Sequence, residues 1–185
     1  RHLVVSTGSA PLIPPIPGLR ELDGVWTNRD AASISEIPAS IVILGGGAVG
    51  VEMAQVLRRF GAEVTVIEGG PHLLAREPVA LGELLAEQFV TEGIEVVLGR
   101  RATACSSDGD DYVVTLDDGS TRRGAKRLVA TGRSPRVDGV GLETVGIDAN
   151  PRGIAVDEHM RAGDGVWAVG ACTGILMFTP VGKSQ

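Results

Sequence analysis

Three glycines spaced as Gly45-x-Gly47-x-x-Gly50 directly follow a short apolar run, residues 41–44, and open a segment with helical periodicity. In a strand–turn–helix unit, the first glycine permits the tight turn and the second lets the backbone approach a bound group closely. The third allows the helix to pack against the strand. Because a helix N-terminus offers unpaired N–H groups and a positive dipole end, the pattern predicts a site for a dinucleotide pyrophosphate. A glycine turn without a ligand is the alternative.

Glu68 ends the next apolar run, residues 64–67, at the distance from the glycines where dinucleotide-binding folds place an acid. There its carboxylate would accept hydrogen bonds from the adenosine ribose hydroxyls and would repel a 2′-phosphate. No arginine occurs between positions 69 and 75 to bind such a phosphate. These residues therefore favour NAD over NADP. A solvated acid at a strand end is the alternative.

A second acid, Glu52, lies in the first turns of the predicted helix. In helical projection it falls on the flank of the apolar stripe, so it need not point into water. The helix dipole favours a carboxylate near this end. These grounds fit a ligand-binding acid and an ordinary first-turn acid equally well.

A repeating strand–helix pattern positions the glycines and Glu68. Apolar runs at 41–44, 64–67 and 94–98 are typical of strands buried on both faces of a parallel sheet. Helices are predicted from residue 49 to a stop at Gly61, and from Pro78 to a stop at Gly93. Their apolar stripes are Val49, Met53, Val56, Leu57 and Phe60 in the first helix, and Leu81, Leu84, Leu85 and Phe89 in the second. The order predicts a Rossmann-like βαβαβ unit of the α/β class.

Shorter elements flank this unit. Residues 11–18 form a proline-rich connector, which suggests a boundary between structural units. An alternating segment at 112–116, the turn Asp117-Asp118-Gly119 and a polar strand to Gly124 predict a β-meander. Further strands are predicted at 3–6, 128–132 and 166–169, a short helix at 29–34, and a single helical turn at 142–145.

Composition excludes several classes of protein. The chain has 185 residues, of which 43% are hydrophobic and 22% charged, which excludes a disordered chain. A net charge of −6 argues against nucleic-acid binding. No apolar run is long enough to cross a membrane. Cys105 and Cys172 lie far apart and form neither a metal cluster nor a CxxC pair, so a reduced cytoplasmic protein is expected.

Both ends of the chain bear on its completeness. The sequence opens directly on a strand pattern and closes without a terminating signal. We therefore expect a fragment of a longer protein, and a compact natural domain whose termini are strand edges is the alternative.

Four segments together resemble the flavin-dependent pyridine nucleotide-disulfide oxidoreductases. They are Gly45-Gly-Gly-Ala-Val-Gly-Val-Glu52, Val64-Thr-Val-Ile-Glu68, Ala130-Thr-Gly-Arg-Ser-Pro135 and Val166-Trp-Ala-Val-Gly170. The dihydrolipoamide dehydrogenase and mercuric reductase branches are the most similar, and residues 73–78 and 92–96 look especially like the latter. The resemblance covers essentially the whole chain.

This resemblance implies a domain plan. A complete subunit of the family has an FAD domain, an inserted NAD(P) domain and a C-terminal dimerisation domain. Residues 18–149 would be the NAD-binding domain, a three-layer Rossmann-like unit with a parallel sheet plus a β-meander. Residues 1–17 would end the first FAD-domain segment, and residues 150–185 would begin the second. The full-length protein would be a homodimer in which NADH delivers a hydride to FAD.

The resemblance also implies roles for single residues. Glu52 would lie beside the nicotinamide carboxamide, Gly132 would border the cofactor on the opposite side, and Gly170 would belong to the FAD-binding turn. The residues lining the NAD pyrophosphate would be Gly45, Gly47, Ala48, Val49 and Gly50.

The chain also departs from the family pattern. Ala171 stands where relatives typically carry an aspartate that binds FAD, so the flavin site here is incomplete. The redox disulfide and the acid/base histidine are absent from the sequence, and neither Cys105 nor Cys172 has a vicinal thiol. We therefore expect no catalytic residue in this chain and no activity of the isolated chain. The electron acceptor is not encoded in it.

Two other interpretations of the function remain open. One is a stand-alone dinucleotide-binding or sensing module without catalysis, which is compatible with Ala171. The other is a flavoprotein reductase that lacks the disulfide.

Overall fold

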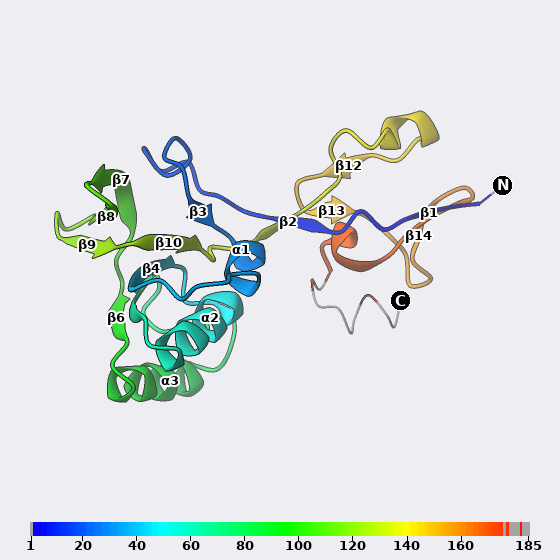
Figure 1. The fold of residues 1–185 in the computed structure, drawn as a ribbon. Helices are drawn as coiled ribbons and strands as arrows, with labels where there is room; N and C mark the ends of the chain where they lie inside the picture. Colours follow the sequence, from blue (N-terminus) through cyan, green and yellow to red (C-terminus); the bar gives the residue numbers. More distant parts are fainter. Residues whose placement is uncertain (1, 176, 178–181, 183–185) are drawn as a thin grey trace. The chain divides into compact units, whose positions relative to one another are not determined.

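The chain folds into two compact units, each described here by itself. The computed structural model describes residues 2–175, 177 and 182. One unit is the continuous segment Pro11–Gly132, and the other combines Arg1–Ala10 with Arg133–Gln185 (Figure 1). The division at Pro11 coincides with the start of the proline-rich connector.

A five-stranded parallel sheet forms the middle of the unit Pro11–Gly132. Its central strand, β4, consists of five residues with side chains alternating between the two faces. Ile41 and Ile43 belong to the core on one face, and Val42 and Leu44 to the core on the other. The strand order is β3 (Val25–Trp26), β10 (Lys126–Val129), β4 (Ser40–Leu44), β5 (Glu63–Glu68) and β6 (Glu95–Leu98). The predicted parallel sheet is therefore confirmed, with every pairing parallel.

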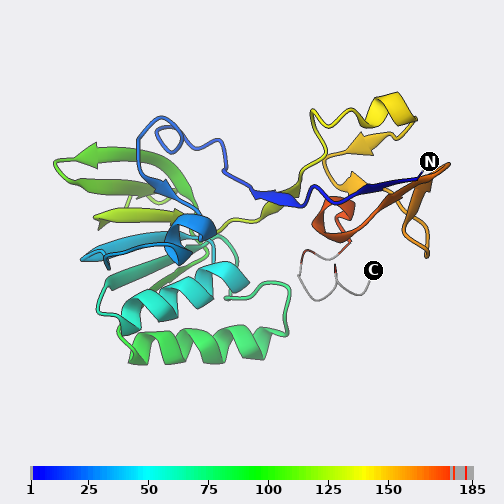
Figure 2. The ribbon, with the colours of Figure 1, turned by 45° about the vertical axis from the view of Figure 1, so that its right-hand side comes forward.

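Helices cover one face of this sheet (Figure 2). They are α1 (Asn28–Ala32), α2 (Ala48–Arg59) and α3 (Val79–Thr91). Gly61 and Gly93 follow the C-caps of α2 and α3 with φ of +102° and +80°, as the predicted stops require. Pro78 occupies the N-cap of α3 rather than its first helical position.

The predicted apolar stripes of the two long helices are partly wrong. Phe60 and Leu84, both placed on a buried stripe, are 70% and 62% exposed. Glycines make close contacts with neighbouring loops instead: a Cβ on Gly50 would lie 1.9 Å from the Gly45 carbonyl oxygen, and one on Gly82 would lie 2.1 Å from that of Leu73. The prediction placed the largest apolar side chains on the buried face of each helix, whereas several of the buried positions are occupied by small residues. The buried residues are Gly50, Val51, Ala54 and Leu57 in α2, and Gly82 and Phe89 in α3.

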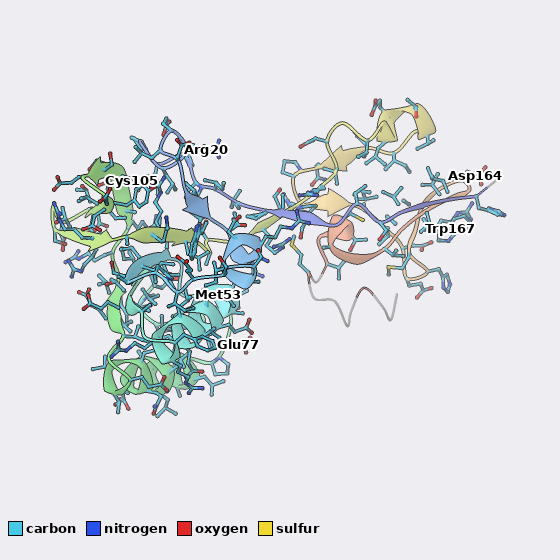
Figure 3. The ribbon with its side chains drawn as sticks, viewed as in Figure 1. Arg20, Met53, Glu77, Cys105, Asp164 and Trp167 are labelled. Atoms are coloured by element: carbon cyan, nitrogen blue, oxygen red, sulfur yellow. The ribbon has the colours of Figure 1, made fainter. Side chains whose placement is uncertain are left out.

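An antiparallel sheet covers the other face. Its strands are β7 (Ala102–Asp108), β8 (Asp111–Leu116) and β9 (Thr121–Gly124), in that order. In Figure 3, Cys105 on β7 and Met53 on α2 mark opposite sides of the parallel sheet. The predicted three-layer α/β fold with a β-meander is confirmed.

Glu92 joins the two long helices. Its Oε1 accepts hydrogen bonds from the side chains of Gln55 (3.1 Å), Arg59 (3.2 Å) and Gln88 (3.1 Å). Its backbone carbonyl accepts a further bond from Arg58 Nε at 2.8 Å. The pKa of Glu92 is lowered most by the hydrogen bond from Arg59 and next by the hydrogen bond from Gln88.

This lowered pKa predicts a dependence of stability on pH. The stabilisation by Glu92 is fully present above the pKa of the unfolded chain and is lost as pH falls through the lower folded pKa. We expect Glu92→Gln to be less stable than the wild type near pH 7, and the difference to shrink as pH falls below the ordinary pKa of glutamate, as measured by urea unfolding at a series of pH values. A stability difference that is constant over this range would contradict the assignment.

The second unit consists of short strands around its own small core. Strand β1 pairs with β15 in parallel, and β14 pairs with β15 antiparallel. The elements are β1 (Leu3–Val5), β2 (Ser9–Pro11), β11 (Arg133–Pro135), η1 (Leu142–Val145), β12 (Ala149–Asn150), β13 (Gly153–Ile154), β14 (Arg161–Gly163), β15 (Val166–Ala168) and η2 (Gly170–Thr173).

The boundaries of the two compact units differ from the domain boundaries that the family resemblance implies. That plan has boundaries after residues 17 and 149, whereas the units divide after residues 10 and 132. Asn150 lies in the β12–β13 hairpin, opposite Gly153. The segment 133–149 therefore packs with the discontinuous unit, because Val137, Leu142 and Ile147 are part of that core.

Candidate functional site

The carboxyl ends of β4, β5 and β10 meet at one edge of the parallel sheet. Gly45 follows β4, and its N–H donates to the Ile67 carbonyl at 2.8 Å. On the other side of β4, the Ala130 N–H donates to the Leu44 carbonyl at 2.8 Å. The predicted residues Gly45, Glu68 and Gly132 are thus brought to the same edge, where ligands bind in open α/β sheets.

The pattern Gly45-x-Gly47-x-x-Gly50 is called the fingerprint below. The fold itself requires two of its three glycines. Gly45 has φ of +107°, and a Cβ there would lie 2.5 Å from the Ala130 carbonyl oxygen. A Cβ on Gly50 would overlap the Gly45 carbonyl oxygen. Both positions therefore exclude a side chain even when no ligand is bound.

Gly47 differs from both of these glycines. Its φ of −77° and ψ of −176° are accessible to any residue. A Cβ built on it meets nothing within 4 Å. Nothing in the described fold therefore requires glycine at position 47, although the position lies at the start of α2.

The N-terminus of α2 carries no side-chain cap from the described residues. Gly47 is the N-cap, and the first intrahelical bond runs from the Val51 N–H to the Gly47 carbonyl at 3.0 Å. Ala48 is exposed and Val49 is half-buried. The N–H groups of the first turn lie at the edge of the sheet, where the helix dipole favours an anion.

Glu68 is held by the backbone of the glycine-rich turn. Its Oε2 accepts the Gly46 N–H at 2.7 Å, and its Oε1 accepts the Gly70 N–H at 2.7 Å. Each carboxylate oxygen retains a second lone pair. The half-buried carboxylate is therefore fixed in place and is still able to accept a hydrogen bond from a ligand hydroxyl.

The segment after Glu68 folds over the fingerprint. The Leu74 N–H donates to the Gly46 carbonyl at 2.8 Å, and Leu74 has φ of +53°. Leu73 is fully buried, and its Cδ2 would lie 2.6 Å from a Cβ on Gly46. Gly46 is thus a third glycine of the turn that the fold requires, a role that the fingerprint alone does not indicate.

Arg101 is a residue of this edge that the sequence reasoning missed. In the sheet, Glu68 is opposite Leu98, and beyond them the Gly99 N–H donates to the Gly70 carbonyl at 2.9 Å. This places the Arg101 side chain against Gly69, with its Cγ 3.2 Å from the position of a Cβ there. The register of β5 and β6 is the only indication of this contact, because the two residues are distant in sequence.

The remaining predicted residues have different surroundings. Glu52 is exposed, and the buried residues of α2 are Gly50, Val51, Ala54 and Leu57. Gly132 is exposed with φ of +138°, and its carbonyl accepts the Leu12 N–H at 3.0 Å. Gly170 belongs to the discontinuous unit, where its φ is +78°.

Both cysteines are buried and free. Burial raises the pKa of the Cys105 thiol, and the charge of Arg127 partly offsets this effect. The Cys172 Sγ lies 3.1 Å from the Val169 carbonyl oxygen. Within the described part of the chain, no three potential metal ligands come together. In that same part, no helix has the length and apolar character needed to cross a membrane.

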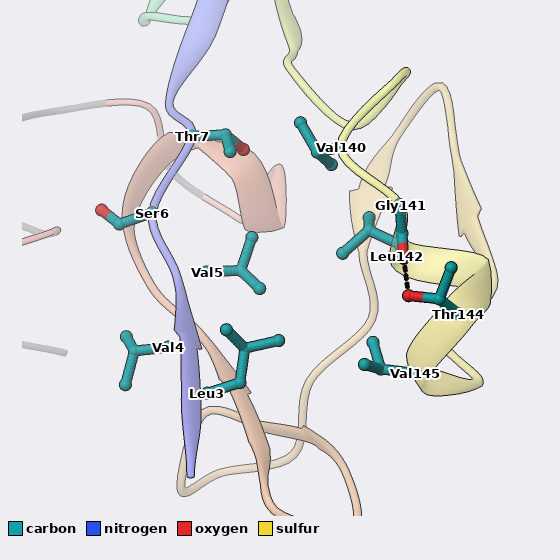
Figure 4. A pocket seen from close by; sticks show the side chains of 10 residues that line it. All are labelled: Leu3, Val4, Val5, Ser6, Thr7, Val140, Gly141, Leu142, Thr144 and Val145. Atoms are coloured by element: carbon teal, nitrogen blue, oxygen red, sulfur yellow. Dashed lines mark hydrogen bonds between the residues drawn. The ribbon is translucent and has the colours of Figure 1, made fainter.

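The discontinuous unit has an open groove of about 360 Å³ (Figure 4). Apolar side chains such as Leu3 and Val145 dominate its lining. The Thr144 hydroxyl donates to the Gly141 carbonyl at 2.6 Å and is therefore already paired. The groove lies in a different unit from the fingerprint edge.

The fold defines an α/β unit with a glycine-rich turn at the carboxyl edge of its parallel sheet, and comparison with known proteins identifies the family. Residues 1–185 match the pyridine nucleotide-disulphide oxidoreductase family. The chain belongs to this family, and its relatives are oxidoreductases.

Individual relatives match almost the whole chain. A mercuric reductase from Acidithiobacillus ferrooxidans is 36% identical over 180 residues, which are 96% of this chain and 32% of the relative. The dihydrolipoyl dehydrogenase of Bacillus subtilis is 35% identical over 163 residues, which are 86% of this chain and 35% of that protein.

Solved structures show the same fold. The HOCl-induced flavoprotein disulfide reductase RclA from Escherichia coli superposes with a TM-score of 0.92 at 29% identity, and the match covers 99% of this chain and 42% of that one. LpdA from Mycobacterium tuberculosis gives a TM-score of 0.86 at 30% identity, covering 98% and 40%. The chain thus spans between about a third and two-fifths of the length of these relatives.

Proposed function

We propose that this chain binds NAD(H) and, in the full-length protein, positions NADH to deliver a hydride to FAD. The observation that carries this proposal is Gly47. The fold leaves open space at this position and no backbone strain, yet it lies at the uncapped N-terminus of α2. A pyrophosphate that approaches the backbone there accounts for a glycine that the fold does not require.

The proposed domain plan rests on the family to which the chain belongs. The NAD-binding domain is residues 18–149, flanked by FAD-domain pieces at 1–17 and 150–185. The compact unit Pro11–Gly132 contains the whole glycine-rich edge. The full-length protein is proposed to be a cytoplasmic homodimer, with the remaining FAD and dimerisation domains outside this chain. Alone, the chain is proposed to be inactive, because it has no vicinal thiol pair.

Each residue of the edge has a proposed role. Gly45, Gly47, Ala48, Val49 and Gly50 line the pyrophosphate. Glu52, exposed on the first turns of α2, is free to approach the nicotinamide carboxamide, and Gly132 borders the opposite side. When bound, NADH supplies the hydride, while the protein provides position and electrostatics. Gly170 is proposed to belong to the FAD-binding turn of the discontinuous unit.

The test of this function is a titration of the chain with NADH by isothermal titration calorimetry. We expect saturable binding of one NADH per chain. Absence of binding at millimolar NADH, with the chain folded by circular dichroism, would overturn the proposal.

Glu68 is proposed to make the site prefer NADH over NADPH. Glu68→Ala removes the carboxylate that pairs with the ribose and repels a 2′-phosphate, so we expect the ratio of the two dissociation constants to move toward one. It also removes two hydrogen bonds from the turn, so thermal unfolding should show a loss of about 2 kcal/mol. Calorimetric titration with both nucleotides measures the first effect.

Glu63→Ala is the matched control, since it removes the same charge from the opposite end of β5. It should leave the preference unchanged. If Glu68→Ala leaves the preference as it is in the wild type, Glu68 has no part in cofactor selection.

A further inference from the structure

Both polar groups of the Gly46 backbone are held by residues outside the fingerprint. Its N–H donates to Glu68 Oε2 at 2.7 Å, and its carbonyl oxygen accepts the Leu74 N–H at 2.8 Å. Leu74 belongs to the segment between β5 and α3, so this second bond joins two separate loops. The peptide unit between Gly46 and Gly47 is therefore fixed by a contact that the glycine pattern does not contain.

The bond from Leu74 determines the direction of the Gly47 N–H. The peptide bond between Gly46 and Gly47 is trans, and in a trans unit the carbonyl and the N–H point in opposite directions. Because the Gly46 carbonyl points at the Leu74 amide, the Gly47 N–H points away from it. This N–H has no acceptor among the described residues. It is thus a free donor with a fixed direction at the N-cap of α2.

Leu74 makes this bond from a backbone conformation that leucine rarely adopts. Its φ of +53° lies in the left-handed region, which costs free energy for a residue with a Cβ. Such strain persists only where the surroundings hold it in place. Here the Leu74 side chain is half-buried against the core on the helical face of the sheet, and Leu73 is fully buried in the same core. The two leucine side chains therefore anchor the segment with the Leu74 amide on the Gly46 carbonyl.

Further contacts brace the same segment. The Leu73 carbonyl oxygen lies 2.7 Å from His72 Nδ1 and would lie 2.1 Å from a Cβ on Gly82, so it is packed directly on α3. The Leu74 carbonyl accepts the Glu77 N–H at 2.8 Å. The position of the Leu74 amide is therefore set by the fold before any nucleotide binds.

We propose that Leu74 is a positioning residue for the nucleotide pyrophosphate, acting through the Gly46–Gly47 peptide. This inference rests on the proposed function and deepens it. Glycines on both sides of the peptide permit it to rotate, which would turn the Gly46 carbonyl oxygen toward the anion and repel it. The Leu74 amide holds that oxygen on the side of the loop, so the turn presents the Gly47 N–H to the phosphates.

The experiment removes the Leu74 N–H and keeps the side chain, by replacing Leu74 with leucic acid in the full chain. The backbone N–H then becomes an ester oxygen. NADH, ADP and adenosine are titrated into a chain with isotope-labelled glycine and followed by NMR. We expect NADH and ADP to bind about tenfold more weakly than to the wild type, because a donor to a charged group is no longer held in place. Adenosine, which has no phosphate, should bind within about twofold of the wild type.

Two matched controls separate positioning from a general loosening of the segment. The same exchange at Glu77 removes the bond to the Leu74 carbonyl, which is also 2.8 Å long and does not involve Gly46. The ester at position 74 also weakens the Leu73 carbonyl as an acceptor, and His72→Ala tests that effect by removing the side chain that contacts this oxygen. Both controls should bind NADH and ADP within about twofold of the wild type.

The Gly47 amide resonance distinguishes a positioning role from a structural one. In the wild type it should shift when ADP saturates the chain, and in the Leu74 ester this shift should be lost even at saturation. Unchanged ADP affinity in the ester would overturn the inference, as would an equal loss for adenosine or in the Glu77 ester. If the wild type does not bind NADH, the proposed function fails as well. Binding of NADH to the wild type and to the ester with equal affinity would refute this inference alone.

Discussion

Gly47→Ala is expected to weaken NADH binding by about a hundredfold while the chain stays folded. The added methyl group meets no protein atom within 4 Å, and the backbone at this position is already in a conformation open to alanine. Loss of a good N-cap residue costs only about 1 kcal/mol of stability. The methyl group does, however, block close approach of a phosphate, with the loss of one or two charge-assisted hydrogen bonds of about 1.5–3 kcal/mol each.

Gly50→Ala provides the contrasting variant. Its Cβ would lie 1.9 Å from the Gly45 carbonyl oxygen, so α2 must shift away from the sheet. We expect a loss of about 3 kcal/mol in the free energy of unfolding by urea. Calorimetric titration and thermal unfolding of both variants separate the two effects. If Gly47→Ala binds NADH like the wild type, position 47 is not in contact with a pyrophosphate.

The central strand β4 could be predicted because it is buried on both faces of the sheet. Ile41 to Leu44 alternate between two cores, so every position is apolar and the strand reads as a continuous run. The helix stops at Gly61 and Gly93 were equally clear, since both glycines have positive φ. The faces of the helices were not predictable in the same way, because small residues such as Ala54 and Gly82 are buried while the large apolar side chain of Phe60 is exposed.

The site could be predicted only as far as it is continuous in sequence. Gly45, Gly47 and Gly50 lie in the turn after β4 and the first turn of α2, and Glu68 ends the adjacent strand. A single βαβ unit therefore contains all four residues. Arg101 reaches the same edge only through the register of β5 with β6. The Glu68 carboxylate is also held by the backbone N–H groups of Gly46 and Gly70, and a pattern of side chains does not reveal such bonds.

Arg127 is the other residue that the sequence did not single out. It lies in β10 and is fully buried among the apolar residues between the parallel and antiparallel sheets. Its Nη2 donates to the carbonyls of Leu22 (2.7 Å) and Asp23 (3.3 Å), and its guanidinium lies 3.9 Å from the centre of the Tyr112 ring. Its Nε and Nη1 have no hydrogen-bond partner among the described residues. The guanidinium is therefore a desolvated charge that is only partly compensated.

Because a buried charge costs free energy unless it is fully paired, the size of Arg127 should matter more than its charge. We expect Arg127→Met, which refills most of the space, to stay within about 1 kcal/mol of the wild-type free energy of unfolding. Arg127→Ala, which leaves a cavity, should lose about 3 kcal/mol. Urea unfolding measures both, and Lys126→Met, at a half-buried neighbouring position, is the control. Equal losses for the methionine and alanine variants would show that the bonds to Leu22 and Asp23 outweigh the cost of burying the charge.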